Sequence, residues 1–296
     1  MLYAIVPGCA LSLDCANVKR RPQTQPPSYR VGGLKASRGL FEQYDKVNII
    51  YNVEMPEVCD EALRVATYNI HSHKNLYSDA INTNSVEEDL KRINAGVVVF
   101  QEVVNEGSER HGFEKMLDKL GYVHRIEGMS TGAFLGNMIA SKYPLVKLGH
   151  ININWKRNVV AAAINFGEWK MAILGTHLEV KSAEVRQKQT REILEFIEKS
   201  IGPTFDLYLL AGDMNAEWNT SEVQHLATNG KLHEVFEAID APYPKYTCWA
   251  GTSIDFIFAS TQIANKVAGA YNYHTTSSDH LPLMVDIVMP VKKSDV

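Results

Sequence analysis

Short apolar segments alternate with amphipathic segments from Leu63 to near the end of the chain. This alternation is typical of an α/β domain, in which strands form the interior and helices cover them. We therefore predict strands at Leu63–Ile70, Gly96–Gln101, Asn137–Ala140, Val159–Phe166, Met171–Thr176, Asp206–Leu210, Ile254–Ala259 and Leu283–Val288.

Three amphipathic helices are predicted between these strands. The first begins at Ser85, because Ser85 and Glu88 have the spacing of a capping box. The second ends at Gly121, and the third follows Ser182. The apolar stripes are Val86, Leu90 and Ile93 in the first helix, Phe113, Met116, Leu117 and Leu120 in the second, and Ile193, Leu194, Ile197 and Ile201 in the third.

The N-terminal part of the chain has a different character. Residues 1–46 carry seven Lys or Arg against three acids, a balance of +4, and prolines interrupt the segment 20–30. Residues 47–53 could form a strand. We predict a partly basic, proline-rich extension over residues 1–60 and the main α/β domain over residues 61–292. The basic residues could contact phosphates or form a solvated arm.

Composition restricts the class of protein. A net charge of −4 argues against a strongly basic, duplex-binding surface over the whole molecule. The four cysteines are far apart, so we expect neither a zinc site nor a disulfide framework. No apolar run reaches the roughly 18 residues of a membrane span. The opening residues 2–13 contain Pro7 and Gly8 and lack a preceding basic stretch, which favours an intracellular location.

Polar residues with metal-ligand or acid–base chemistry gather where the predicted strands end. Each cluster alone could be an Asx turn, a solvated strand end or a buried core histidine. Six such clusters at six strand ends instead indicate one site. They are Thr67-Tyr68-Asn69-Ile70-His71, Phe100-Gln101-Glu102-Val103, Thr176-His177-Leu178, Gly212-Asp213-Met214-Asn215, Ile254-Asp255-Phe256 and Ser278-Asp279-His280.

The order and context of these clusters resemble the endonuclease/exonuclease/phosphatase family. The matching stretches are TYNIH, FQEV, GNMIASKYPL, GTHLE, LAGDMNA, SIDFIFAS and SSDHLPL, which lie between residues 64 and 288. The resemblance implies a four-layer α/β sandwich, in which two facing mixed β-sheets are flanked by helices. It also implies an active site at one edge of the sandwich, where loops of both sheets meet.

A phosphodiester is anionic, and its transition state gathers further charge on the non-bridging oxygens, so a catalyst needs a hard cation there. The resemblance implies that Glu102 is a direct metal ligand, with Asn69 nearby and Asp279 in support of the same ion or a second one. Oxygen ligands of this kind favour Mg²⁺ or Mn²⁺ over zinc.

The resemblance also assigns catalytic roles. Asp213 would orient or deprotonate the attacking water, and Asn215 would hold the phosphate. His280 would lie beside the phosphate, with Asp255 fixing its tautomer and raising its basicity, and this pair would act either as general base or as electrostatic stabiliser. His177 would be a further donor to the phosphate oxygens.

His71 departs from the pattern, because some relatives carry an acid at this position. The departure puts a second metal site in doubt. His71 and His73, with Asp79, also invite comparison with zinc hydrolases. The remaining ligands of such a site do not occur at matching positions, so we do not expect one.

Substrate selection is expected to reside in loops, because a catalytic core of this type treats all its substrates as phosphate esters. Aromatic loop residues could stack on bases, or could serve ordinary packing. The residues predicted to bind substrate are Asn137, Trp155, Arg157, Trp218 and Trp249.

We therefore expect a monomeric, Mg²⁺- or Mn²⁺-dependent phosphodiesterase that cuts nucleic acid, DNA or RNA. A phosphatase or a phospholipid phosphodiesterase of the same family is the alternative. A binding module that has lost catalysis is less favoured, because every residue of the implied site is present.

Overall fold

The computed structural model describes residues 55, 58, 62–78, 80–129, 133–154, 156–166, 169–241 and 243–289. The strand predicted at 47–53 and the basic extension lie outside this range, so the predicted division of the chain near residue 60 stays a prediction. No helix in the described ranges is long and apolar enough to cross a membrane.

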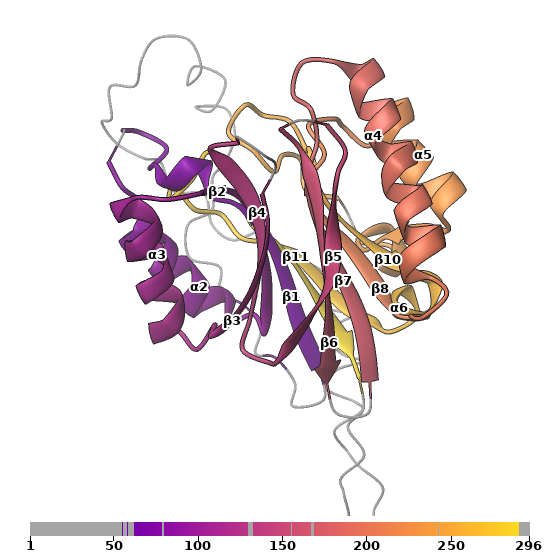
Figure 1. The fold of residues 1–296 in the computed structure, drawn as a ribbon, viewed down its shortest axis with the longest axis horizontal. Helices are drawn as coiled ribbons and strands as arrows, with labels where there is room; N and C mark the ends of the chain where they lie inside the picture. Colours follow the sequence, from indigo (N-terminus) through magenta and orange to yellow (C-terminus); the bar gives the residue numbers. More distant parts are fainter. Residues whose placement is uncertain are drawn as a thin grey trace, which may run out of the picture.

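Two six-stranded mixed sheets form the centre of the molecule (Figure 1). The first has the strand order β11-β12-β1-β2-β4-β3, with β11 Val267–Asn272, β12 Leu283–Val288, β1 Ala62–Asn69, β2 Val97–Val104, β4 Leu135–Ser141 and β3 His124–Gly128. The second has the order β5-β6-β7-β8-β10-β9, with β5 Leu145–Asn152, β6 Asn158–Phe166, β7 Trp169–His177, β8 Tyr208–Asp213, β10 Asp255–Ser260 and β9 Leu232–Glu234.

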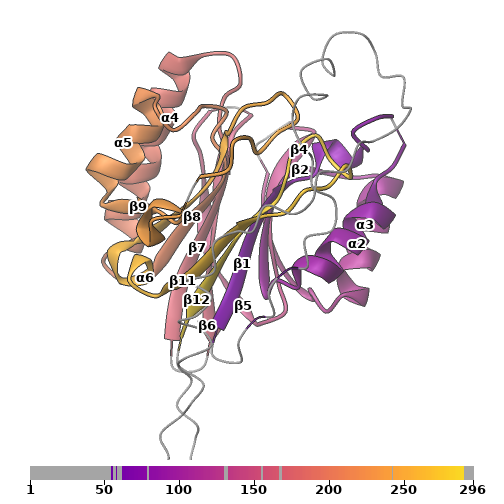
Figure 2. The same cartoon turned by 180° about the vertical axis from the view of Figure 1, so that it is seen from behind.

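Each sheet contains one parallel pair, β1 with β2 and β7 with β8, among antiparallel neighbours. Helices α2 (Thr83–Ile93) and α3 (Ser108–Lys119) cover the outer face of the first sheet, and α4 (Ala183–Phe196) and α5 (Ser221–Gly230) cover that of the second (Figures 1 and 2). The predicted four-layer α/β sandwich is therefore confirmed.

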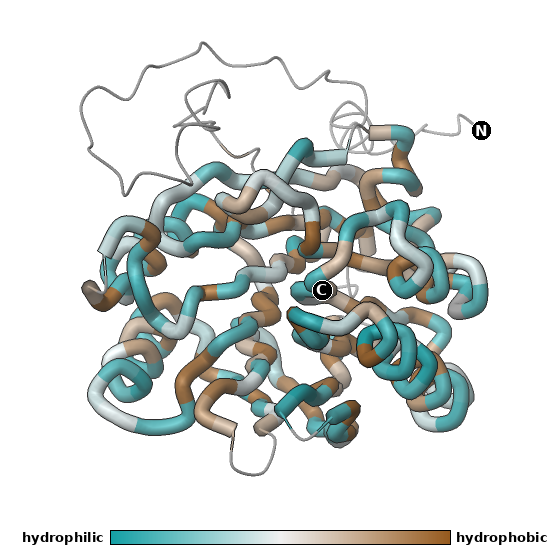
Figure 3. The backbone as a smooth tube through the Cα atoms, turned by 90° about the horizontal axis from the view of Figure 1, so that it is seen from above, coloured by the Kyte–Doolittle hydropathy of each residue, from teal (hydrophilic) through white to brown (hydrophobic). Residues whose placement is uncertain are grey.

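Burial on both faces explains the continuous apolar runs of the central strands. In β2, Val97 and Val99 pack in the core between the sheets, whereas Val98 and Phe100 pack against the layer of α2 and α3. The sheets approach closely at Gly175, where an added Cβ would lie 2.6 Å from Val99 Cγ1. Hydrophobic and hydrophilic positions alternate along the covering helices (Figure 3), as the amphipathic patterns require.

The second and third helices are found where the sequence predicted them, and Ser182 caps α4 by accepting a hydrogen bond from Val185 N. The prediction of a capping box at Ser85 is wrong. Helix α2 begins at Thr83 with Asn82 as its N-cap, and Ser85 Oγ donates to Asn82 O inside the first turn. A local hydroxyl bond thus competes with the predicted cap.

The eight strands predicted between residues 63 and 288 are all present, and within the described residues the pattern missed four others. Strands β3 and β5 carry many half-buried or exposed side chains, so they lack a clear apolar signal. Strand β9 has only three residues, and β11 is built largely of small residues. The connections between strands and helices also contain the short helix α6 (Thr261–Ala264) and the 3₁₀ turns η2 (His71–His73) and η4 (Glu237–Ile239). A π-helical turn, η3 (Ile197–Ile201), follows α4.

We expect Gly212→Ala to destabilise the fold. Gly212 has φ of +152°, and a Cβ there would overlap the carbonyl oxygen of Thr176 on the neighbouring strand. Strain and overpacking together should lower the free energy of unfolding by about 3 kcal/mol or more. Gly112→Ala is the control, because Gly112 lies within α3 with no atom near its added Cβ. Chemical denaturation of both variants checks this, and equal midpoints would contradict it.

Candidate active site

The side chains predicted to act together meet at one edge of the sandwich, where strands of both sheets end. Asn69 ends β1 of the first sheet, and Asp213 ends β8 of the second. Asn69 Nδ2 lies 3.1 Å from Asp213 Oδ2 and 3.4 Å from Glu102 Oε1. The buried amide of Asn69 therefore joins the two halves of the site.

A β-bulge directs Glu102 into this site. Between the pairs Phe100–Met138 and Val103–Gly136, Gln101 and Glu102 both face the single residue Asn137. Glu102 has φ of +59°, a conformation that a non-glycine residue rarely adopts. Bulges of this kind re-aim a side chain beside functional sites. The carboxylate of Glu102 consequently leaves the alternation of β2 and is partly exposed.

The turn after β1 surrounds the same carboxylate. His71, Ser72 and His73 all have positive φ, which curls η2 tightly over the strand end. The backbone N–H of His71 donates to Asn69 Oδ1 at 3.1 Å, and Ser72 Oγ donates to Glu102 Oε2 at 2.8 Å. His71 Nε2 lies 3.6 Å from Asp279 Oδ2, so the turn also adjoins the third predicted metal ligand.

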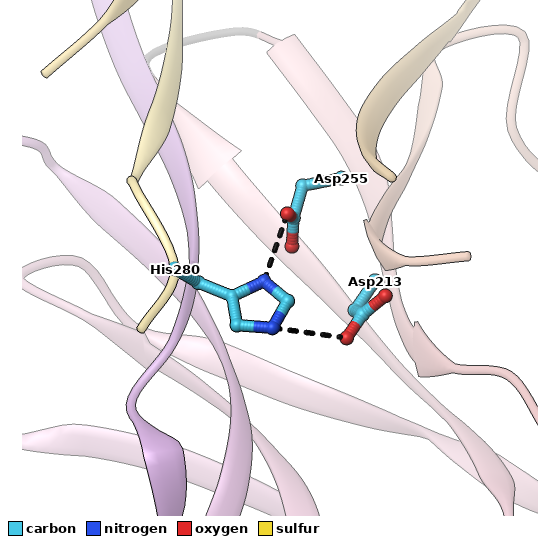
Figure 4. Close-up of side chains that lie close together, drawn as sticks. All are labelled: Asp213, Asp255 and His280. Atoms are coloured by element: carbon cyan, nitrogen blue, oxygen red, sulfur yellow. Dashed lines mark hydrogen bonds and ion pairs between the residues drawn. The ribbon is translucent and has the colours of Figure 1, made fainter. Parts of the chain in front are cut away.

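Three adjacent strands of the second sheet supply the other half of the site. His177 on β7 and Asp255 on β10 are both direct register partners of Asp213 on β8. His280 enters from the loop between β11 and β12 of the first sheet. Its Nδ1 lies 2.9 Å from Asp255 Oδ2, and its Nε2 lies 3.7 Å from Asp213 Oδ2 (Figure 4). The imidazole therefore lies between two buried carboxylates.

The charges in this triad determine its protonation. Burial alone would lower the pKa of His280, but the carboxylates of Asp255 and Asp213 outweigh it and hold that pKa well above its ordinary value. Burial raises the pKa of Asp213 to about 7, against the opposing charge of His280. His280 is consequently an imidazolium paired with Asp255, while Asp213 can exchange a proton near neutral pH.

Thr247 supports Asp255 and was not recognised in the sequence. Its Oγ1 donates to Asp255 Oδ2 at 2.7 Å and accepts hydrogen bonds from the backbone N–H groups of Ile254 and Asp255. A threonine eight residues before an aspartate carries no pattern of its own. Only the turn that folds Thr247 back onto β10 reveals its role.

His177 and Asn215 flank Asp213. His177 Nε2 lies 3.3 Å from Asp213 Oδ2, and burial together with the charges of Arg157 and His280 lowers the pKa of His177 well below its ordinary value. His177 is therefore neutral. The backbone N–H of Asn215 donates to Asp213 Oδ1 at 2.8 Å, and Asn215 Nδ2 donates to Leu178 O.

Arg157 belongs to the same electrostatic field. Burial lowers the pKa of this half-buried guanidinium, while the charges of Asp213, Glu179 and Glu102 raise it. Arg157 thus adds a positive charge beside the carboxylates.

Two other residues predicted to bind substrate, Asn137 and Trp218, contact neighbouring residues of the protein. Asn137 Nδ2 donates to Asn158 O and Oδ1 across the two sheets. The Trp218 ring packs against Phe256 and Phe258 in the core beneath α4 and α5. These contacts hold Asn137 and Trp218 in place, and their assignment to substrate binding stays a prediction.

Trp249 is buried, and its Nε1 donates to Thr275 O at 3.1 Å. This contact joins Trp249 to the loop that carries His280, and its assignment to substrate binding stays a prediction. Trp155 lies outside the described residues, so its assignment to substrate binding stays a prediction.

The residues near Glu102 suit a divalent cation. Each Glu102 oxygen receives one hydrogen bond, and the carboxylate remains partly exposed, so it keeps acceptor capacity. Asn69 Oδ1, which accepts one hydrogen bond from His71 N, and Asp279 Oδ2, which lies beside His71 Nε2, would add oxygen ligands of the kind that match Mg²⁺ or Mn²⁺. Asp213, Asp255 and His280 also have ligand atoms within 4.8 Å of one another. There, however, the imidazolium already supplies the cation, so that cluster fits acid–base chemistry better.

Comparisons with known proteins agree with this geometry. The sequence profile of the Endonuclease/Exonuclease/phosphatase family matches residues 66–280. Sphingomyelinase C of Bacillus cereus is 23% identical over 263 residues, which cover 75% of this chain and 77% of that protein.

Two solved structures share the fold. The human nocturnin catalytic domain with bound sulfate has a TM-score of 0.62 and 20% identity over 78% of this chain and 95% of its own. The mannosyl-6-phosphatase Bt3783 of Bacteroides thetaiotaomicron has a TM-score of 0.60 and 16% identity over 75% of this chain and 98% of its own. At identities of 20% and 16%, these likenesses show a shared fold and give no information on the substrate.

The His280 imidazole should titrate at lower pH in Asp255→Asn than in the wild-type protein. The Asp255 carboxylate favours the charged imidazole, so its removal lowers the pKa of His280. NMR of the histidine side chains as a function of pH measures this. Asp118→Asn, which removes an exposed carboxylate on α3, is the control. An unchanged His280 midpoint in Asp255→Asn would refute the pairing.

Proposed function

The chain belongs to the endonuclease/exonuclease/phosphatase family of hydrolytic phosphoesterases, and from this premise we propose that it is a divalent-metal-dependent phosphodiesterase acting on nucleic acid. One observation carries the proposal. The buried His280–Asp255 pair faces Asp213, and Asn69 connects Asp213 to the partly exposed Glu102. An acid–base group therefore adjoins an oxygen-donor cluster.

In the proposed reaction, Glu102, Asn69 and Asp279 would hold Mg²⁺ or Mn²⁺. The cation would supply charge stabilisation for the phosphate oxygens in the transition state.

Asp213 and His280 divide the proton chemistry. The gap of 3.7 Å between His280 Nε2 and Asp213 Oδ2 exceeds a hydrogen bond, so both groups can address a water or phosphate oxygen placed beside them. Asp213 Oδ2 takes the proton of the attacking water, because the pKa of Asp213, raised by burial to about 7, suits a base at neutral pH. The His280 imidazolium, oriented by Asp255, stabilises the phosphate oxygens through Nε2–H. As the water oxygen bonds to phosphorus, the bond from phosphorus to the leaving oxygen breaks, and the leaving oxygen takes its proton from solvent water.

His177, Asn215 and Arg157 complete the binding of the phosphate in this proposal. His177 is neutral and offers a donor that does not repel Arg157. The planar guanidinium of Arg157 can donate two parallel hydrogen bonds to phosphate oxygens.

Exposed aromatic residues near this edge favour nucleic acid. Phe134 precedes β4, and its carbonyl accepts a hydrogen bond from Asn105 N just past the end of β2. Its side chain is 66% exposed, and that of Tyr77 is 43% exposed. Stacking of a base on an aromatic ring contributes about 1–3 kcal/mol, which suits single strands and unpaired ends.

Hydrolysis of a phospholipid head group is the second candidate. The exposed Phe134 and Val180 are apolar residues in segments that adjoin Glu102 and His177, and such residues also suit an acyl chain. The similarity to sphingomyelinase C points the same way. A monomeric state and an intracellular location remain predictions.

Hydrolysis of a substrate panel tests the proposal. Single-stranded DNA, duplex DNA, RNA, poly(A), sphingomyelin and sugar phosphates are assayed with Mg²⁺, Mn²⁺ or chelator. We expect metal-dependent cleavage of single-stranded nucleic acid. Glu102→Gln should abolish it and weaken Mn²⁺ binding, measured by calorimetry, at least about tenfold. Glu88→Gln, an exposed position on α2, is the control. Cleavage of sphingomyelin alone would select the second candidate.

Phe134→Ala should raise KM for single-stranded nucleic acid and leave kcat nearly unchanged, because a stacking residue at the rim binds substrate and transition state alike. Val123→Ala is the matched control. Val123 is 56% exposed and directly precedes β3. The first residue of β3 pairs with the last residue of β4, so Val123 lies at the opposite end of the strands from Phe134. Steady-state kinetics of both variants check this, and equal KM values would exclude the stacking role.

A further inference from the structure

The loop that presents Asp279 and His280 is held by neighbouring segments along its whole length. It connects β11 to β12, and Tyr273 N donates to Pro282 O at 3.0 Å to close its base. The loop accepts hydrogen bonds from Trp249 Nε1 at Thr275 O, from Leu76 N at Thr276 O, from Asn82 Nδ2 at Ser277 O and from Trp249 N at Asp279 O, and Ser278 Oγ donates to Asn69 O. Its path is therefore fixed by contacts on several sides.

A buried carboxylate beneath the loop has no part in the proposed reaction. Asp89 lies on α2 and is 5% exposed. Thr275 Oγ1 lies 3.0 and 2.9 Å from its two oxygens, and Tyr68 OH donates to its Oδ2 at 2.9 Å. Thr275 Oγ1 also accepts a hydrogen bond from Ser277 N at 3.1 Å. Asp89 thus holds the start of the segment that ends at His280.

Helix α2 connects this loop to the opposite half of the site. Asn82, its N-cap, lies seven residues before Asp89, which is two helical turns and the same face. Asn82 Nδ2 contacts Ser277 O at 2.7 Å and also Ile70 O and Lys74 O, at 3.0 and 2.9 Å. One helix face therefore fixes the His280 loop relative to the turn beside Asn69.

The buried carboxylate is costly, which argues for a specific role. Burial raises the pKa of Asp89 to about 6, although hydrogen bonds from Ser277, Thr275 and Tyr68 oppose the rise. An apolar side chain at this position would avoid the cost of desolvation but could not hold Thr275. Buried, satisfied polar networks can fix one geometry where apolar packing allows several.

We propose that Asp89 is a positioning residue: by holding Thr275 it fixes the loop that aligns His280 with Asp255. The kinetic consequence rests on the proposed function, whereas the alignment of His280 does not. Asp89 touches neither the substrate nor the reacting atoms in this proposal, and it acts through the loop.

Thr275→Val provides the direct test, because it removes the hydroxyl that bonds Asp89 and preserves shape. We expect kcat to fall between about tenfold and 100-fold with little change in KM, as for a small misplacement of a catalytic group. The distance between His280 Nδ1 and Asp255 Oδ2, which is 2.9 Å in the wild-type protein, should also lengthen in a crystal structure of Thr275→Val, because the loop no longer holds the ring in place. Thr190→Val is the matched control, since Thr190 is a buried residue whose hydroxyl bonds Gln187 O within α4.

Two substitutions of Asp89 separate positioning from simple stability. Asp89→Asn keeps an oxygen that can accept from Thr275, and Asp89→Ala does not. We expect kcat to fall, and the distance between His280 Nδ1 and Asp255 Oδ2 to lengthen, in the order wild type, Asp89→Asn, Asp89→Ala, beyond any change shared with Thr190→Val. Thermal melts of all four variants measure that shared loss.

A Thr275→Val protein in which His280 Nδ1 keeps its wild-type distance of 2.9 Å to Asp255 Oδ2 overturns the proposal, whatever its kcat. So does a loss of kcat that follows only the melting temperature and is matched by Thr190→Val. If the wild-type protein cleaves nothing in the substrate panel, the proposed function fails, while the distance between His280 and Asp255 in the variants still decides whether Asp89 positions the ring.

Discussion

The close packing of the two sheets is the constraint on which the site depends. At Gly175 the sheets leave no room for a side chain, since a Cβ would lie 2.6 Å from Val99 Cγ1. Because β1 and β8 belong to different sheets, only this close approach allows the Asn69 amide to contact Asp213. The oxygen-donor cluster comes mainly from one sheet and the flanking acid–base residues from the other, so neither half forms a site alone.

Burial gives the acid–base half its chemistry. Asp213 and Asp255 are register partners on adjacent strands, an arrangement in which two like charges repel. The His280 imidazolium between them offsets this repulsion, and burial raises the pKa of Asp213 to about 7. The charge that the fold must accommodate at this edge is thus also the charge that a phosphate reaction can use.

The site has a buried, hydrogen-bonded centre and an exposed rim. The centre is formed by buried, hydrogen-bonded groups, and the loop that carries His280 is fixed by contacts to α2, β1 and the segment around Trp249. The rim instead exposes Phe134, Tyr77 and Val180. A fixed centre with a variable rim is the arrangement through which one fold serves several phosphate esters.

The sequence by itself determined the fold class, all eight strands that have a clear apolar run, two helix positions, and the residues that converge at the sheet edge, since periodicity and strand-end chemistry are local signals. Only the tertiary structure decided which of these residues touch. The bulge at Glu102 depends on pairing with β4, and the Thr247 support depends on a turn that folds back onto β10. The packing of Trp218 and the Asp89–Thr275 bond join residues from separate elements. Such contacts leave no trace in local pattern, because they arise when distant segments are packed together.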